Sequence, residues 1–256
     1  YYVSDTNGND GNDGQSQAQA KKTIGAALAL ATTDGDIVEI IDEATYDDES
    51  QLVIAAQNIT LTHTASQLGR PIYDASGLGS QVDAINLGTT NAGVKRGFVL
   101  NGIEIKGKHE ASSGGFPGSR LFDNFSNSTN ANGMVISDCF IHGFSVLSDK
   151  SLQVGAGSTL EIQSSSFMFA AGSTQALSAY GPSSSPGQVI INNCFFSRSF
   201  GSTAFGILEG FQGNGGLNTT ASFCTFVFRP VASETVGNST PIVARFAKVI
   251  NCVIRG

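Results

Sequence analysis

The chain has 256 residues and a formal net charge of −7, and only 14% of its residues are charged. A nucleic-acid partner would need clustered Lys and Arg on one surface, so this balance argues against nucleic-acid binding. No apolar run approaches the roughly 18 residues of a membrane-spanning helix, which argues against a membrane span. The low charge and the abundant glycine favour one elongated domain built of strands and tight turns.

The first residues of the chain predict a cap for a stack of strands. Tyr1–Ser4 is typical of a short strand, and Asp5–Gly14 is rich in the Asp, Asn and Gly of turns. Ala18–Ala31 predicts a helix, and Asp36–Ile40 predicts the next strand. Four apolar residues fall on one face of the helix: Ile24, Ala27, Leu28 and Ala31. A helix of this kind is expected to lie across the open apolar end of a solenoid.

The turn-rich segment carries oxygen-bearing side chains at alternate positions, as calcium-binding loops do. Its candidate ligands are Asp5, Asn7, Asn9 and Asp10. The pattern lacks the Gly expected at the sixth position, where Asp10 stands, and the Glu expected at the twelfth, where Ser16 stands. An ordinary loop is therefore the favoured interpretation, and calcium is the one cofactor that the sequence leaves open.

A short phrase returns along the rest of the chain. It reads apolar–x–apolar, then a small or amide residue, then Cys or Gly, then apolar again, with its clearest copies at Val99–Ile105, Val135–Ile141, Val189–Phe196 and Val249–Ile254. In the second half of the chain the apolar residue after the turn recurs every 27 to 31 residues. This period is typical of solenoids, and the alternation is that of β-strands, so we predict a parallel β-helix.

The residue before the repeated cysteines predicts a tight turn, because Asp and Asn tolerate left-handed backbone angles. Asp138, Asn193 and Asn251 hold this position. The cysteines are expected as small buried residues with free thiols, each in a different coil of one stack: Cys139, Cys194, Cys224 and Cys252. Two disulfide bridges are the alternative in an oxidising compartment.

Two intervals of the repeat are longer than the others, from Ile59 to Ile103 and from Ile103 to Phe140. Each interval must hold an extra coil or an inserted loop, and Asn86 is a candidate marker of an extra coil. The expected organisation is therefore one domain over residues 1–256, with a cap over 1–35, coils over 36–256, and inserted loops near 106–132 and 199–218.

The order of motifs near the N-terminus is similar to that of right-handed parallel β-helix proteins. The matching stretches are Tyr2–Ser4, Lys22–Ile24, Ala26–Leu28, Gly35–Val38 and Gln57–Leu61. This opening resembles that of the pectate-lyase-like superfamily, many bacterial surface proteins, and phage tail-spike or capsid-associated proteins. The resemblance implies an all-β fold, a right-handed parallel β-helix solenoid with a short N-terminal capping helix. It implies no single activity, because enzymes and inert shafts share the fold.

One group of charged residues could serve a polysaccharide lyase. Such an enzyme needs a base beside a uronate carboxylate and a cation that neutralises this carboxylate. The candidates lie on and after the Ile103 repeat: Lys106, Lys108, His109 and Arg120. A solvated loop is the favoured alternative, since no accompanying motif supports a lyase. The longer signatures of pectin hydrolases are absent, and His63 and His142 are interpreted as turn or surface histidines.

Aromatic residues in Gly-, Ser- and Asn-rich stretches favour binding over catalysis. Such rings can pack on the solenoid body, stack on sugar rings or seal a protein interface. The binding candidates are Phe116, Phe122, Phe125, Phe205 and Phe211.

Together these patterns predict a non-catalytic structural, decorating or adhesive β-helix of the extracellular space, a cell surface or a virion surface. A polysaccharide lyase or a related carbohydrate-active enzyme acting on an acidic polysaccharide is the alternative, and a calcium-dependent carbohydrate-binding module is a third. Polysaccharide, further copies of the chain or a larger assembly are the expected partners. Ile250, Val253 and Ile254 are expected at an apolar core edge, and association is expected through this end or along the flank of the coils.

Overall fold

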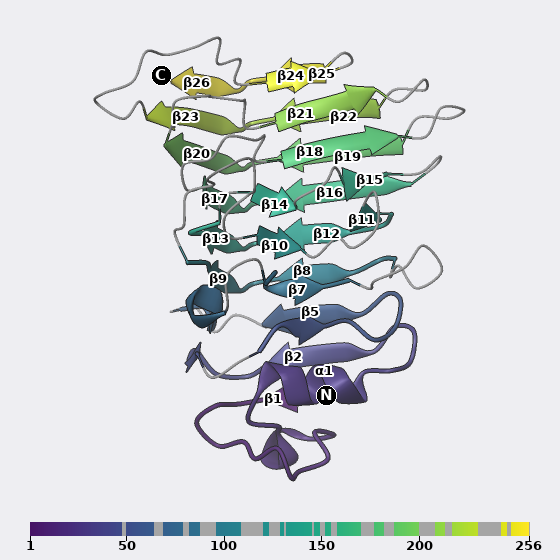
Figure 1. Ribbon diagram of the computed structural model, residues 1–256, viewed down its shortest axis with the longest axis vertical. Helices are drawn as coiled ribbons and strands as arrows, with labels where there is room; N and C mark the ends of the chain where they lie inside the picture. The colour runs from purple at the N-terminus through teal and green to yellow at the C-terminus, as the bar shows by residue number, and fades with distance from the viewer. Residues whose placement is uncertain are drawn as a thin grey trace.

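In the computed structural model, short strands stack into one elongated body with the two chain ends at opposite ends of the stack (Figure 1). The structure describes residues 1–47, 50–63, 69–78, 82–87, 96–108, 120–122, 129–130, 132–144, 146–148, 152–154, 158–169, 177–181, 187–199, 208–212, 217–229, 242–244 and 247–255.

The predicted cap covers the N-terminal end of the stack. It consists of strand β1 (Tyr2–Val3), the 3₁₀ turn η1 (Gln17–Gln19) and helix α1 (Ile24–Leu30). The apolar face is confirmed, because its four residues are buried: Ile24, Ala27, Leu28 and Ala31. The helix is shorter than the predicted Ala18–Ala31. Lys21 forms a parallel bridge with Val3 and stays extended, and the Thr23 hydroxyl caps the helix by accepting a hydrogen bond from Ala26 N at 3.2 Å.

One carboxylate ties the N-terminal loop to the first coil. Asp42 Oδ2 accepts hydrogen bonds from Ser4 Oγ at 2.7 Å and from Thr6 N at 3.0 Å, and Asp42 Oδ1 accepts one from the Tyr46 hydroxyl at 2.6 Å. Partial burial alone would raise the pKa of Asp42, but the hydrogen bonds, led by that from Tyr46, hold this pKa below its usual value. The ionised carboxylate is therefore the form that fastens the cap.

We expect Asp42→Asn to lower the free energy of unfolding by about 1 kcal/mol at pH 7, a value discounted for the partial exposure of the site. Because the folded pKa lies below the usual value of 3.8, the stabilisation is complete above that pH and is lost as the pH falls through the folded pKa. Denaturant unfolding of both proteins between neutral and acidic pH measures the difference. Asp47→Asn, at an exposed carboxylate nearby, is the control; an equal loss there, or a difference that persists in acid, would contradict the assignment.

Two long sheets form the body. Sheet A contains nine strands, in spatial order β1, β2 (Ile37–Ile40), β5 (Thr60–His63), β8 (Val99–Asn101), β12 (Val135–Ser137), β16 (Thr159–Gln163), β19 (Gly187–Asn192), β22 (Leu217–Ser222) and β25 (Ala247–Ile250). Sheet B contains eight, in spatial order β3 (Thr45–Tyr46), β6 (Ile72–Asp74), β9 (Glu104–Lys106), β13 (Phe140–His142), β17 (Ser166–Phe169), β20 (Phe195–Ser199), β23 (Thr225–Arg229) and β26 (Val253–Arg255).

Two shorter sheets complete the coils between sheet B and the next strand of sheet A. Sheet C contains β4 (Leu52–Val53), β7 (Ile85–Asn86), β10 (Arg120–Phe122) and β14 (Val146–Ser148). Sheet D contains β11 (Thr129–Asn130), β15 (Leu152–Gln153), β18 (Leu177–Gly181), β21 (Leu208–Gln212) and β24 (Ile242–Ala244). A second 3₁₀ turn, η2 (Ala75–Gly77), follows β6. Strands β10, β11 and β21 thus lie inside the segments 106–132 and 199–218, which were predicted as inserted loops.

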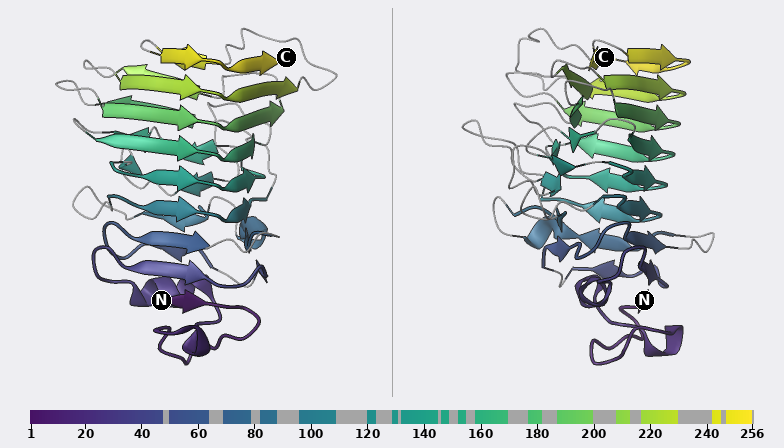
Figure 2. Two further views of the ribbon diagram at one scale, coloured as in Figure 1. Left: turned by 180° about the vertical axis from the view of Figure 1, so that it is seen from behind. Right: turned by 90° about the vertical axis from the view of Figure 1, so that its right-hand side faces the viewer.

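Every strand pair in the described part of the four sheets is parallel. Each strand pairs with the equivalent strand one coil away, so the sheets run along the long axis (Figure 2). The predicted all-β parallel β-helix solenoid is confirmed. Its physical basis is that one coil cannot bury its own apolar face, whereas stacked coils bury one continuous core.

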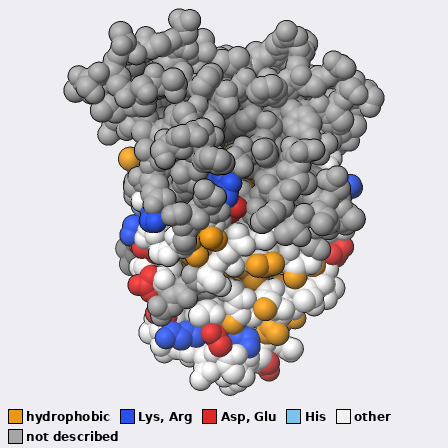
Figure 3. Space-filling view, viewed as in Figure 1, with side chains coloured by type: hydrophobic (Ala, Val, Ile, Leu, Met, Phe, Trp, Pro, Cys, Tyr) orange, Lys and Arg blue, Asp and Glu red, His pale blue; other side chains and the backbone are white. Residues whose placement is uncertain are grey.

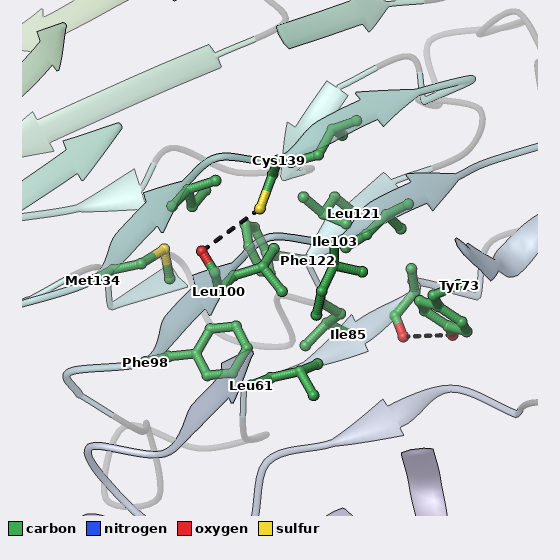
Figure 4. Close-up of a cluster of buried hydrophobic side chains, with 14 of the residues drawn as sticks. Leu61, Tyr73, Ile85, Phe98, Leu100, Ile103, Leu121, Phe122, Met134 and Cys139 are labelled. Atoms are coloured by element: carbon green, nitrogen blue, oxygen red, sulfur yellow. Dashed lines mark hydrogen bonds between the residues drawn. The ribbon is translucent and has the colours of Figure 1, made fainter. Parts of the chain in front are cut away.

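The described core is built from the inward-facing side chains of sheets A, B and C (Figure 4). In sheet B the inward column runs through Tyr73, Ile105, Ile141, Phe167, Phe196 and Phe226. Three of these rings form a nearly parallel ladder, with centroids 4.9 Å apart for Phe167 and Phe196 and 5.2 Å apart for Phe196 and Phe226.

The predicted left-handed turns lie at the corner between sheet A and sheet B. Asp138, Asn193 and Asn251 have φ angles of 50°, 53° and 51°. The backbone N–H of the first two donates to the residue before the equivalent turn one coil on, from Asp138 N to Gln163 O at 3.1 Å and from Asn193 N to Ser222 O at 3.0 Å. The full set of described residues at this corner is Gly102, Asp138, Ser164, Asn193, Phe223 and Asn251.

A second corner, just before sheet A, uses the same local pattern. Asn58 has a φ angle of 55° and aligns with Gly97 and Gly133, which also have positive φ. The predicted equivalence of Ile59 and Ile103 is therefore wrong, because the two residues follow different corners. Asn86 lies in β7 of sheet C, and β5 pairs directly with β8, so no extra coil exists between Ile59 and Ile103.

The four cysteines occupy one column just after the corner, as predicted. Backbone hydrogen bonds run from Ser166 N to Cys139 O, from Thr225 N to Cys194 O, and from Val253 N to Cys224 O, each at 2.8 Å. All four thiols are free. Ser165 takes the position between the first two cysteines, since Phe195 N donates to Ser165 O at 3.0 Å.

The last coil corrects the predicted core edge. Ile254 aligns with the buried Phe226 and faces inward, as predicted, but Val253 aligns with Thr225 and Ile250 with Ser222, both on the outer surface. Val249, which aligns with Ala221, is the other inward residue of this coil.

Candidate functional site

Charged and aromatic side chains gather on the outer face of sheet B, on three successive coils. Because side chains alternate along a strand, the residues flanking each buried one point outward. Register places Glu104 beside Phe140 in one outward column. The next outward column holds Asp74, Lys106 and His142 in consecutive coils. We call these five residues the sheet-face cluster.

Two polar pairs link the coils of the sheet-face cluster. Lys106 Nζ lies 2.7 Å from Asp74 Oδ2, and His142 Nε2 lies 3.0 Å from Glu104 Oε1. The His142 ring also stacks on the ring of Phe140, with centroids 4.7 Å apart. Asp74 is further held by a 2.9 Å hydrogen bond from Ser76 N. Each polar group thus has a fixed position on a rigid strand.

The Asp74–Lys106 pair is charged at neutral pH. Partial burial acts to raise the pKa of Asp74, but the hydrogen bonds from Lys106 and Ser76 outweigh it and lower this pKa. The hydrogen bond to Asp74 and its negative charge raise the pKa of Lys106. Lys106 is therefore a fixed cation rather than a proton acceptor under neutral conditions.

A third ion pair borders the cluster at the corner with sheet A. Arg70 Nη2 lies 2.5 Å from Asp138 Oδ1, although the two residues belong to coils on either side of the Gly102 corner. On the face of the molecule in Figure 3, acidic and basic side chains likewise lie beside each other near the N-terminal end of the stack. These surfaces are mixed in charge, so they offer both cationic and anionic hydrogen-bonding groups to a ligand.

The structure separates the residues proposed for a lyase. Lys106 belongs to the sheet-face cluster, and Lys108 is exposed just beyond β9. Arg120 lies in sheet C, where it forms an ion pair with the buried Asp83. His109 lies outside the described residues.

The sequence did not connect Lys106 with Asp74, Glu104 and His142. Asp74 is 32 residues from Lys106, and Glu104 is 38 residues from His142. Only the register of the coils brings them together. The sequence shows the alternation within each strand. It does not show which strands of successive coils align, because the loops between them differ in length.

The five Phe residues predicted to bind a ligand do not gather in loops on one surface within the described residues. Phe122 is fully buried in the core (Figure 4), which corrects its assignment to a binding surface. Phe211 lies in β21 of sheet D rather than in a loop. Phe116, Phe125 and Phe205 lie outside the described residues. Phe140, which the sequence indicated as a repeat position and not as a binding residue, is the ring that lies among the polar groups.

The N-terminal loop uses its polar side chains on the protein itself. Asp10 accepts hydrogen bonds from Lys22 N and Thr23 N, both at 2.9 Å, and Asn9 Oδ1 accepts one from Gly11 N at 2.8 Å. Asp5 lies 3.9 Å from the Lys22 ammonium group. Within the described ranges, no three His, Cys, Asp or Glu side chains are grouped so that they could hold a metal ion. Calcium binding by Asp5, Asn7, Asn9 and Asp10 stays a prediction.

The fold thus defines an all-β parallel β-helix protein with a polar and aromatic cluster on one sheet. No protein-family model matches the chain, and no curated protein matches it. Among solved structures it is similar to a GH136 lacto-N-biosidase from Eubacterium ramulus, crystallised as a selenomethionine derivative. The identity is 12% and the TM-score 0.41, over 100% of this chain and 67% of the other. Across the described ranges, none of the helices has the length and apolarity needed to span a membrane.

Proposed function

We propose that this protein is a non-catalytic structural or adhesive β-helix that binds a carbohydrate chain through the sheet-face cluster. The observation that carries the proposal is the pair of polar contacts, Asp74–Lys106 and Glu104–His142, around the ring of Phe140. Carboxylates and ammonium groups form hydrogen bonds with sugar hydroxyls, and an aromatic ring packs on the apolar face of a sugar. Strands hold all five side chains in place before a ligand arrives, which lowers the entropic cost of binding.

The protonation of the cluster favours binding over catalysis. General acid–base catalysis is most efficient when the pKa of the catalytic group lies near the operating pH. The raised pKa of Lys106 and the lowered pKa of Asp74 move both groups away from these roles. We place the protein at an extracellular, cell or virion surface, because its N-terminal segment resembles those of β-helix proteins found there.

We expect the protein to bind soluble polysaccharides in affinity gel electrophoresis, with uronate polymers such as pectate and alginate as the first probes. Lys106→Ala should weaken binding about tenfold or more, because it removes a charged donor and leaves Asp74 without its cation. Phe140→Ala should weaken binding by a similar factor through loss of the ring.

The matched control is Lys248→Ala, which removes an exposed lysine from sheet A. It changes the net charge by the same amount as Lys106→Ala, so it tests whether the effect is local. Equal weakening by both lysine variants would indicate long-range electrostatics and contradict a defined site. Binding that neither Lys106→Ala nor Phe140→Ala reduces would place the ligand elsewhere.

A polysaccharide lyase is the second candidate, favoured by the Glu104–His142 pair. A carboxylate that holds an imidazole orients it for proton transfer, and Lys106 beside it could neutralise a uronate carboxylate. The same uronate polymers test this function through the ultraviolet absorbance of unsaturated products. We expect no such absorbance. If it rises, and His142→Ala and Lys106→Ala abolish it, the protein is an enzyme and the non-catalytic function is wrong.

A further inference from the structure

The left-handed corner contains one residue that does not suit it. Four of the six described corner residues are Gly, Asp or Asn, which adopt positive φ with little strain, and the fifth is the small residue Ser164. The sixth is Phe223, with a φ angle of 54° and 61% of its surface exposed. A bulky residue in this region is an outlier, and an exposed ring gains little from burial in return. The fold therefore exposes an aromatic ring at a corner position that is occupied by Asn in two other coils.

Phe223 borders a surface without acidic residues on the C-terminal half of sheet B, formed by two outward columns. Beyond the sheet-face cluster, one outward column of sheet B continues through Ser166, Phe195, Thr225 and Val253. The other continues through Met168, Ser197 and Val227 and ends at the exposed Arg255. The strands that carry these columns lie one above the other at the left of Figure 1. The apolar residues of this surface, which we call the uncharged strip, are Met168, Phe195, Phe223, Val227, Ile250 and Val253.

Several side chains of the uncharged strip are exposed. Met168 is 38% exposed, Val253 44% and Ile250 45%. Ile250 and Phe223 are neighbours, since Phe223 N donates to Ile250 O at 3.0 Å. Register with Ser222 and Thr225 shows that Ile250 and Val253 point sideways from the stack. Their outward direction is set by strand alternation and differs from that of Val249 and Ile254, which face the core. Contiguous exposed apolar residues of this kind mark an interaction surface.

We propose that the uncharged strip is the contact surface for a second copy of this chain, with the two helix axes side by side and parallel. The strip follows the coil repeat, with one step of about 4.8 Å per coil. A second copy carries a surface with the same step, so the side chains of two parallel copies meet at the same height. Such a contact is isologous about a two-fold axis parallel to the stack.

The charge distribution favours the same partner. Two copies that each carry a net charge of −7 repel at most approaches. The two outward columns contain no acidic residue, and their only charged residue is Arg255 in the last coil, so approach through this surface separates the acidic groups. In the parallel arrangement the sheet-face clusters also meet at one height, and each offers both signs of charge through Asp74, Glu104 and Lys106. Burial of the Phe223 ring between the copies would offset its backbone strain.

Replacement of Phe223 by Asn, the residue at this corner in two other coils, tests association without disturbing the fold. We expect wild-type protein to show concentration-dependent association in analytical ultracentrifugation. Phe223→Asn should weaken association about tenfold or more. Its melting temperature, measured at a concentration where both proteins are monomeric, should be unchanged or higher, because Asn suits the left-handed corner. Val253→Thr, which keeps the shape of the side chain, should weaken association without unfolding the last coil.

The matched control is Ile37→Ser, which removes another apolar residue, 52% exposed, from sheet A. It should leave association unchanged. Thr225→Cys tests the parallel arrangement, because this residue lies within the strip and should form a disulfide with its own copy under mild oxidation. A wild type that is monomeric at every concentration, an equal effect of Ile37→Ser, or association without the Thr225→Cys bridge would overturn the proposal. Polysaccharide binding is measured separately on monomeric protein, so failure of one proposal leaves the other testable.

Discussion

Phe196→Ala is expected to lower the free energy of unfolding by about 3–5 kcal/mol. Phe196 is fully buried at the centre of the ring ladder, with Phe167 and Phe226 stacked on its two faces at 4.9 and 5.2 Å. The substitution removes the transfer free energy of one ring, both stacking contacts, and the filling of the cavity between three coils. Backbone pairing of the neighbouring strands prevents the coils from collapsing onto the space.

The loss should be local to the coils that contain β17, β20 and β23. Coupling in a solenoid runs mainly between neighbours, so hydrogen exchange should accelerate most in these strands and least near α1. Urea unfolding reports the total effect. Phe223→Ala, in the adjacent coil, is the matched control, because it removes the same ring from an exposed position and should cost less than about 0.5 kcal/mol. Equal losses at both positions would show that the ladder adds no stability of its own.

Asp83→Ala is expected to lower the free energy of unfolding by about 3 kcal/mol. Asp83 is 2% exposed and forms an ion pair with Arg120 in sheet C. Removal of the carboxylate leaves a largely buried guanidinium group without the charge that compensates it, and this costs more than the pair itself contributes. Denaturant unfolding at neutral pH measures the effect.

The double variant Asp83→Leu with Arg120→Leu is the decisive comparison. It removes both charges and fills part of their space with apolar atoms, so it should be more stable than Asp83→Ala. Lys106→Ala is the surface reference, because the Lys106 side chain is 40% exposed in its ion pair with Asp74, so its removal should cost less stability than that of Asp83. A double variant as unstable as the single one would show that shape, rather than charge, determines the role of Asp83.

Local features of the fold were predictable from single stretches of sequence. The turn residues Asp138, Asn193 and Asn251 adopt the left-handed conformation that their chemistry favours. The apolar face of the capping helix is buried as its spacing predicted, although the helix begins later, at Ile24. Such features depend on residues within one turn or one helix, where propensity and periodicity act directly.

The wrong predictions concern local sequence patterns that occur at more than one position in the coil. Ile59 and Ile103 each follow a left-handed residue, Asn58 or Gly102, but the first corner leads into sheet A and the second leads out of it. Val253 was expected to face inward, and its register with Thr225 turns it outward. A shift of one residue in the register moves every side chain of a strand to the other face of the sheet. The apolar pattern alone therefore does not determine which side chains face the core.

The sequence by itself determined that this protein is a stack of strand-rich coils with a helical cap, because alternation and period are properties of short segments. Only the tertiary structure decided which side chains share a surface. Lys106 was a candidate from its position near a repeat, but its partner Asp74 and the Glu104–His142 pair come from other coils. Loops of unequal length separate these residues in the chain. Parallel pairing brings these residues together despite the unequal loops, because each strand aligns with its equivalent in the next coil whatever the length of the loop between them.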